Sequence, residues 1–145
     1  MAYRTIFNPK NPRKYAGDVS KIVCRSMWER NVCVFCDEHS SILKWSSEEI
    51  AIPYMSPIDK KMHNYYPDFL IQFQNTNGLQ NWMVEVKPKK QTMIKENASK
   101  KEKFTWIVNN CKWNAAKSYC DKNNMVFKII TEKELFSNGN TTKSN

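Results

Sequence analysis

The sequence predicts an α/β fold in which helices flank a central mixed β-sheet. Three observations support this prediction: a β-hairpin pattern at residues 64–90, amphipathic helical patterns at about 21–38 and 101–122, and a further strand at 125–130. With 145 residues, 41% of them apolar, the chain is large enough for one domain with a substantial core.

Composition narrows the classes of partner. No run of 18 apolar residues occurs, and the segment Met1 to Lys10 lacks the apolar stretch of a signal peptide. We therefore expect a soluble cytoplasmic protein that does not bind a membrane. The net charge of +9 favours a polyanionic partner. Five cysteines are expected to be thiols, and Cys33 and Cys36 are expected to pack on a buried helix face, because no second Cys or His pair completes a zinc site.

The first 38 residues divide into two parts. Residues 1–20 are basic, contain prolines and have no helical period, which predicts an extended arm. Between about residues 21 and 38, an apolar stripe recurs at helical spacing, formed by Cys24, Trp28, Val32 and Phe35. Glu29 precedes Cys33 and Cys36 by four and seven positions, so its side chain shares a helix side with small, half-apolar residues.

A short strand and a polar loop precede the hairpin. The stretch from Ile50 to Tyr54 is typical of a strand, and Pro53 favours an edge position or a strand end. The loop covers residues 55–64. Asn77-Gly78 is typical of a type I′ turn between two alternating apolar runs. Six side chains then form the core face of the hairpin: Phe69, Ile71, Phe73, Trp82, Val84 and Val86.

The opposite face of the hairpin gathers charged residues at its open end. If Asn77-Gly78 is the two-residue loop, paired positions sum to 155, which sets Asp68 opposite Lys87 and makes Glu85 a diagonal neighbour of Asp68. All three side chains project from one face. Neighbouring carboxylates favour a proton or a metal ion, and oxygen ligands suit Mg²⁺, with Mn²⁺ as a substitute. A lysine beside such a site suits phosphodiester hydrolysis. The alternative is an ordinary cross-strand ion pair.

The remainder of the chain is basic and then helical. Residues 87–103 are rich in lysine, and we expect four of these lysines to contact a DNA backbone: Lys89, Lys90, Lys100 and Lys101. A helix at about 101–122 has the apolar stripe Phe104, Val108, Cys111, Ala115 and Tyr119. Thr131 and Glu134 have capping-box spacing for a last helix at 132–136. The predicted organisation is an arm at 1–20, a domain at 21–136 and a disordered tail at 137–145.

Pro67-Asp68 followed by Glu85-Val86-Lys87 resembles the PD-(D/E)xK signature of restriction-type endonucleases. Further stretches resemble TnsA-like transposon nucleases in order and spacing: "RSMWER", "WSSEEIAIPY", "YYPDF" and "VEVKPKK". From "NPKNPRKYAGD" to "KWNAAKSYCDKNNMVFKIITEKEL", the chain is still more similar to head completion nucleases of T-even-like phages.

This resemblance implies a restriction-endonuclease-like fold and a Mg²⁺-dependent DNA endonuclease. It implies that Asp68, Glu85 and Glu29 are metal ligands, that Lys87 is the catalytic lysine, and that Glu29 acts from the first helix. Glu48 is a further acid in one of the stretches that resemble the TnsA-like nucleases, and whether it takes part in the site stays open. The implied role is cutting or trimming packaged double-stranded DNA before heads join tails. The implied partners are head, portal or tail-joining proteins, in the host cell cytoplasm or with the virion.

Two alternatives remain at this point. One is a non-catalytic structural protein of head completion that binds DNA ends, and the intact set Glu29, Asp68, Glu85 and Lys87 argues against it, because like charges facing phosphate do not help a pure binder. The other is a TnsA-like transposon or defence nuclease, which would share the same site.

Overall fold

The computed structural model describes residues 4–134. The elements are, in order, β1 (Thr5–Ile6), the 3₁₀ turns η1 (Pro12–Lys14) and η2 (Val19–Lys21), β2 (Val23–Cys24), α1 (Met27–Glu38), β3 (Ile42–Ser47), β4 (Ile52–Met55), β5 (Met62–Tyr65), β6 (Phe69–Asn75), β7 (Gly78–Val86), η3 (Lys89–Thr92), α2 (Lys100–Lys122) and β8 (Val126–Ile130). Among these residues no helix is long and apolar enough to span a membrane.

The main sheet has the strand order β3-β6-β7-β8. The first three strands are antiparallel neighbours, whereas β8 runs parallel to β7 and reaches it through α2. The sheet is therefore mixed, as predicted. Two-stranded ribbons, β1-β2 and β4-β5, lie outside it.

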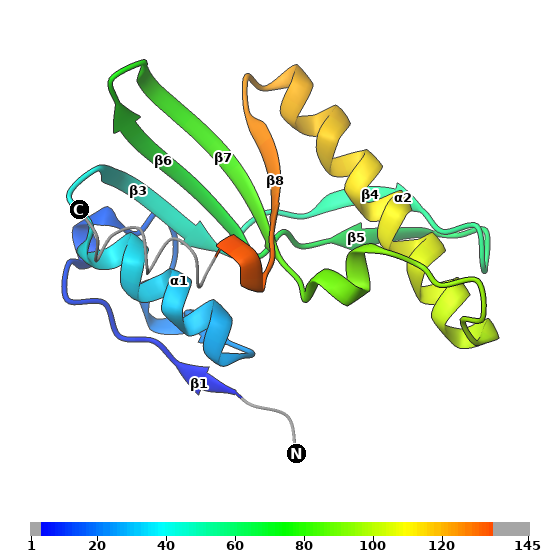
Figure 1. Ribbon diagram of the computed structural model, residues 1–145. Helices are drawn as coiled ribbons and strands as arrows, with labels where there is room; N and C mark the ends of the chain where they lie inside the picture. The colour runs from blue at the N-terminus through cyan, green and yellow to red at the C-terminus, as the bar shows by residue number, and fades with distance from the viewer. Residues whose placement is uncertain (1–3, 135–145) are drawn as a thin grey trace.

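Each face of the sheet is covered by one helix (Figure 1). Phe69, Val84 and Val86 belong to a core cluster with α1 and the N-terminal segment. Met83, on the opposite face, belongs to a second cluster with α2, β4 and β5. The chain thus has the predicted α/β fold, a restriction-endonuclease-like sheet flanked by helices.

The N-terminal segment, residues 1–20, was predicted as an extended arm, but its described part packs against the main sheet and α1. Phe7 and Tyr15 are buried edge-on against Trp45, with ring centroids 5.9 and 4.8 Å away. Lys10 N and Asn11 N donate to the carboxylate of buried Asp37, at 2.8 and 2.9 Å. The described part of the segment, residues 4–20, therefore shares the core of the first cluster, and the division at residue 20 stays a proposal.

Helix α1 begins later than predicted, at Met27 instead of about residue 21. Ser26 caps it by accepting a hydrogen bond from Glu29 N at 3.1 Å. Its buried face contains Val32, Cys33 and Cys36, whereas Phe35, assigned to the apolar stripe, is 51% exposed. The expected burial of the two cysteines is confirmed.

Four strands were not predicted: the short β1 and β2, and the longer β3 and β5. In β3 a register irregularity between Ile42 and Lys44 breaks the alternation of buried and exposed residues. Strand β5 falls mostly in the predicted polar loop, and its first three residues are exposed. It is a strand because it pairs with β4, not because it has an alternating hydrophobic pattern. The predicted strand at 50–54 lies two residues later, as β4.

The predicted hairpin exists, but its register differs. Asn75 pairs with Gly78, so paired positions sum to 153 and the loop is Thr76-Asn77. Asn75 Oδ1 accepts Asn77 N at 2.8 Å, and Gly78 has a φ of +106°. The Asn75 side chain starts the turn early, which shifts the predicted pairing by two positions.

The C-terminal elements follow the prediction closely. Helix α2 begins after a capping box of Ser99 and Glu102, but its buried stripe is one residue further on than predicted and consists of Asn109, Trp113, Ala116 and Cys120. Thr131 and Glu134 make the expected cap, with Thr131 Oγ1 donating to Glu134 Oε2 at 2.7 Å. Residues 132–134 are helical, while the rest of the predicted last helix and the predicted tail at 137–145 lie outside the described residues.

Candidate active site

The acidic residues meet at one end of the main sheet. Because β6 is antiparallel to β3 and β7, its first residue lies beside the last residues of both neighbours. Asp68 directly precedes β6, Glu48 directly follows β3, and Glu85 is the second-last residue of β7. Glu29 reaches the same end from the first turn of α1. Sheet topology, not sequence proximity, brings these carboxylates together.

Asp68 lies at the centre of the group. Its Oδ2 accepts Val86 N at 2.7 Å, and its carbonyl oxygen accepts Glu48 N at 3.2 Å. Continuing the observed register sets it directly opposite Glu85 instead of diagonally. Burial raises the pKa of Asp68 well above its usual value, and the negative charge of Glu85 raises it further. This carboxylate therefore favours a proton or a cation.

Glu85 is 6% exposed, and its two carboxylate oxygens have different neighbours. The Tyr65 hydroxyl donates to its Oε1 at 2.6 Å, and Lys87 Nζ lies 3.7 Å from its Oε2. Burial raises the pKa of Glu85, against the lowering effects of Tyr65 and Lys87. Burial also raises the pKa of Tyr65 far above its usual range, so the phenol keeps its proton and acts as a donor.

Glu29 and Glu48 complete the group. Burial raises the pKa of Glu29, whose Oε1 accepts Arg25 N at 3.1 Å. Glu48 binds Arg25 through two contacts of 3.1 Å, from Nε and Nη2. It also has a φ of +54°, in the left-handed region that costs a non-glycine residue free energy.

One carboxylate oxygen from each of Glu29, Glu48 and Asp68 lies within 4.8 Å of the other two. This set differs in one member from the predicted ligands, because Glu48 stands where Glu85 was expected and Glu85 instead pairs with Tyr65 and Lys87. An all-oxygen donor set fits a hard divalent cation such as Mg²⁺. The pKa values of Glu29 and Asp68, which burial raises, fit the same conclusion, since a cation stabilises a buried negative charge.

The predicted residues thus fall into two groups. Glu29, Asp68, Glu85 and Lys87 gather at the sheet end. The four predicted DNA-contacting lysines are exposed on the elements that follow: Lys89 and Lys90 in η3, and Lys100 and Lys101 at the start of α2.

Sequence reasoning missed Tyr65, Arg25 and the residues of α2 that lie behind Glu85. The charge of Lys112 lowers the pKa of Glu85, as does the nearby indole of Trp113, although that N–H has no hydrogen-bond partner of good geometry among the described residues. The signal for Tyr65 was its place three residues before Asp68. The residues of α2 gave no signal, because only the packing of the helix brings them to the site.

Comparison with known proteins places the site in a nuclease context. Residues 39–132 match the family described as TnsA-like endonuclease N terminal, a range that contains Glu48, Asp68, Glu85 and Lys87. The chain is also 39% identical to the head completion nuclease of Enterobacteria phage T4, over 93% of this chain and 95% of that protein.

Proposed function

This chain belongs to the TnsA-like endonucleases, and from this premise we propose that it cuts DNA in a Mg²⁺-dependent reaction during phage head completion. Endonuclease activity is the activity of the family. The metal, the residue roles and the stage of assembly are the proposal. One observation supports it above all: three carboxylates converge within 4.8 Å beside the pair of Glu85 and Lys87.

The metal ligands in this proposal are Asp68, Glu29 and Glu48, with Glu85 as the adjoining carboxylate. An ion held by these residues would supply Lewis-acid chemistry for the attack of water on the phosphate. Arg25 holds Glu48 through two contacts, so it fixes one carboxylate that faces the other two.

Lys87 is the proposed catalytic lysine. Its ammonium group lies 3.7 Å from Glu85 Oε2 and its side chain is 29% exposed, so it can also contact a phosphate that enters from solvent. There it neutralises charge that develops on the phosphoryl oxygens and orients the attacking water. Tyr65 holds Glu85 from the opposite side, which leaves the second carboxylate oxygen facing the lysine.

Double-stranded DNA is the proposed substrate. The exposed lysines Lys89, Lys90, Lys100 and Lys101 extend from Lys87 along η3 to the start of α2, where they would contact the phosphate backbone. The relative's name, head completion nuclease, supports a role at the phage head. We propose further that the DNA is packaged and that the partners are head or tail-joining proteins. The protein would then act in the host cytoplasm and with the virion.

The first test incubates the purified protein with linear, circular and branched DNA, in Mg²⁺ or in EDTA. We expect cleavage in Mg²⁺, including linearisation of circles, and none in EDTA. Cleavage in EDTA, or none in Mg²⁺ and Mn²⁺, would overturn the metal-dependent mechanism.

The second test separates catalysis from a structural role in the head. Filled heads made without this protein are supplied with the wild type or with Asp68→Asn, and tail-joined particles are counted. We expect joining with the wild type alone. Full joining with the variant would assign the role to binding instead of cleavage.

A further inference from the structure

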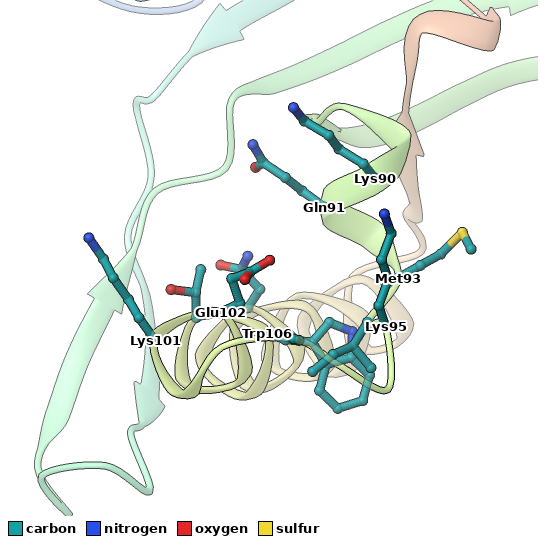
Figure 2. Close-up of a pocket in the computed structure, with 11 residues that line it drawn as sticks. Lys90, Gln91, Met93, Lys95, Lys101, Glu102 and Trp106 are labelled. Carbon is teal, nitrogen blue, oxygen red and sulfur yellow. The ribbon is translucent and has the colours of Figure 1, made fainter.

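Two of the proposed DNA-contacting lysines, Lys90 and Lys101, also line a cleft whose other residues have no role in the proposal above. The cleft, of about 460 Å³, lies between η3, the linker that follows it and the first half of α2. Figure 2 shows Lys90 and Gln91 reaching over it from η3, with Lys101 and Trp106 on α2 below.

The lining of the cleft is positively charged. Lys90, Lys95 and Lys101 line it, and no ion pair among residues 4–134 involves any of them. Glu102 is the one acid of the lining, and its carboxylate accepts Ser99 N at 3.1 Å in the helix cap. The three ammonium groups can therefore bind an anion.

The lining also contains apolar side chains that do not contribute to the core of the fold. Met93 is 62% exposed and Ile94 38% exposed, and neither they nor Trp106 belongs to a core cluster. Exposed apolar area costs about 25 cal/mol per Å² relative to burial. Aromatic rings beside ammonium groups bind unpaired nucleotides, because bases stack on the ring while phosphates contact the cations.

The cleft lies within reach of a strand bound at the candidate active site. Its lining residue Asn109 is one helical turn before Trp113, whose indole lies near Glu85. Trp106 and Trp113 are seven residues apart on α2, which corresponds to about 10 Å along the helix axis. That length equals about three nucleotides of a duplex strand.

We propose that this cleft binds unpaired nucleotides of the DNA strand next to the cut, with a base against Trp106 and phosphates on Lys90, Lys95 and Lys101. A duplex offers its phosphates but not its base faces, so the aromatic floor favours a single-stranded or frayed end. The inference rests on the proposed DNA substrate and adds the structural form of that substrate.

The test measures binding in EDTA by fluorescence anisotropy, with three labelled DNAs: a blunt duplex, a duplex with a single-stranded overhang and a single strand. Trp106→Ala should weaken binding of the overhang and the single strand by about 5- to 100-fold and change duplex affinity less than about twofold. Trp106→Phe should restore most of the loss, because it keeps a ring. Phe104→Ala, at an exposed aromatic residue of α2 outside the lining, is the matched control and should have no effect.

A second variant covers the case in which Trp106→Ala unfolds the protein. Met93→Gln keeps the net charge and the length of the side chain but replaces an exposed apolar contact of the cleft with a polar one, so it should weaken single-strand binding selectively, with an unchanged melting temperature. Unchanged single-strand affinity in both variants, or equal losses for duplex and single strand, would overturn the inference. Blunt-duplex cleavage in Mg²⁺ tests the proposed function separately, since a duplex contacts the lysines of the cleft without a base against Trp106.

Discussion

At the scale of the residue, Asp68 is the position where catalysis and stability can be separated. Asp68→Asn keeps the size of the side chain but removes a charge from the carboxylate group, so cleavage should fall by about 100-fold or more. The melting temperature without metal should stay equal or rise, because repulsion with Glu85 is relieved. Gel assays and thermal melts measure both quantities.

The matched control for this charge change is Glu96→Gln, at an exposed acid of the linker before α2. It should leave both cleavage and melting unaltered. Wild-type cleavage by Asp68→Asn would move the chemistry elsewhere, and a clear loss of stability would make Asp68 a structural residue.

The pKa shifts predict how stability depends on pH in metal-free protein. Burial raises the pKa of Asp68, Glu85 and Glu29, so each binds its proton more tightly in the folded state than in the unfolded state. The stability that these protons contribute is complete below the unfolded pKa of about 4 and is lost as pH rises through the folded pKa values. Mg²⁺ should remove much of this loss, because it replaces the protons.

Thermal melts between about pH 4 and pH 8, with EDTA or with Mg²⁺, measure this difference. Asp68→Asn should flatten the EDTA profile, since one shifted group has gone. An EDTA profile that rises across this range would contradict the assignment of raised pKa values.

At the scale of the element, the packing of helix α1 against the sheet depends on two buried cysteines. Cys33 and Cys36 are fully buried, and burial raises the pKa of Cys36 to about 12, so it is a thiol at neutral pH. Changing both to alanine should lower the free energy of unfolding by about 1–3 kcal/mol and leave Mg²⁺-dependent cleavage intact. Urea titration measures the loss, and Cys111→Ala, at a partly buried position, should cost less. Stoichiometric zinc in fresh protein would defeat this interpretation.

The lysines of η3 and α2 should act as a phosphate-binding element. Alanine at Lys89, Lys90, Lys100 and Lys101 should weaken binding to unrelated sequences alike. It should flatten the slope of log affinity against log salt by about 0.9 for each phosphate that a lysine no longer neutralises. Lys117→Ala with Lys122→Ala, exposed at the other end of α2, is the control for charge alone. An unchanged slope would make the four lysines a solvated surface.

At the scale of the whole molecule, the N-terminal segment should be needed for folding. A chain that begins at residue 21 lacks Phe7 and Tyr15, which pack edge-on against Trp45. Loss of a buried aromatic side chain costs about 3–5 kcal/mol, and a domain has only about 5–15 kcal/mol in total. Circular dichroism of this chain should show a large loss of folded structure, whereas a chain ending at residue 136 should melt like the full length. A stable chain from residue 21 would support the boundary at residue 20.

Elements with strong local patterns could be predicted from the amino-acid sequence. The turn residues between alternating strands predicted the hairpin of β6 and β7, and its alternation predicted which side chains form the core face. The spacing of apolar residues predicted the first residue of α2 to within one position. The motif of Asp68, Glu85 and Lys87 predicted at which end of the sheet the charged residues lie. These features follow from a period of two or 3.6 residues, which is visible in a linear chain.

The other features could not be predicted, because they depend on contacts between residues that are distant in the sequence. The hydrogen bond between the Asn75 side chain and Asn77 N fixed the register of the hairpin, which the Asn77-Gly78 turn motif alone did not predict correctly. Pairing with β4 made the polar segment β5 a strand. The antiparallel order of β3 and β6 brought Glu48 to Asp68, across 20 positions of sequence, and made it a candidate ligand. Carboxylate repulsion and burial arise only after such folding, so the environment of each acid could not be read from the motif that contains it.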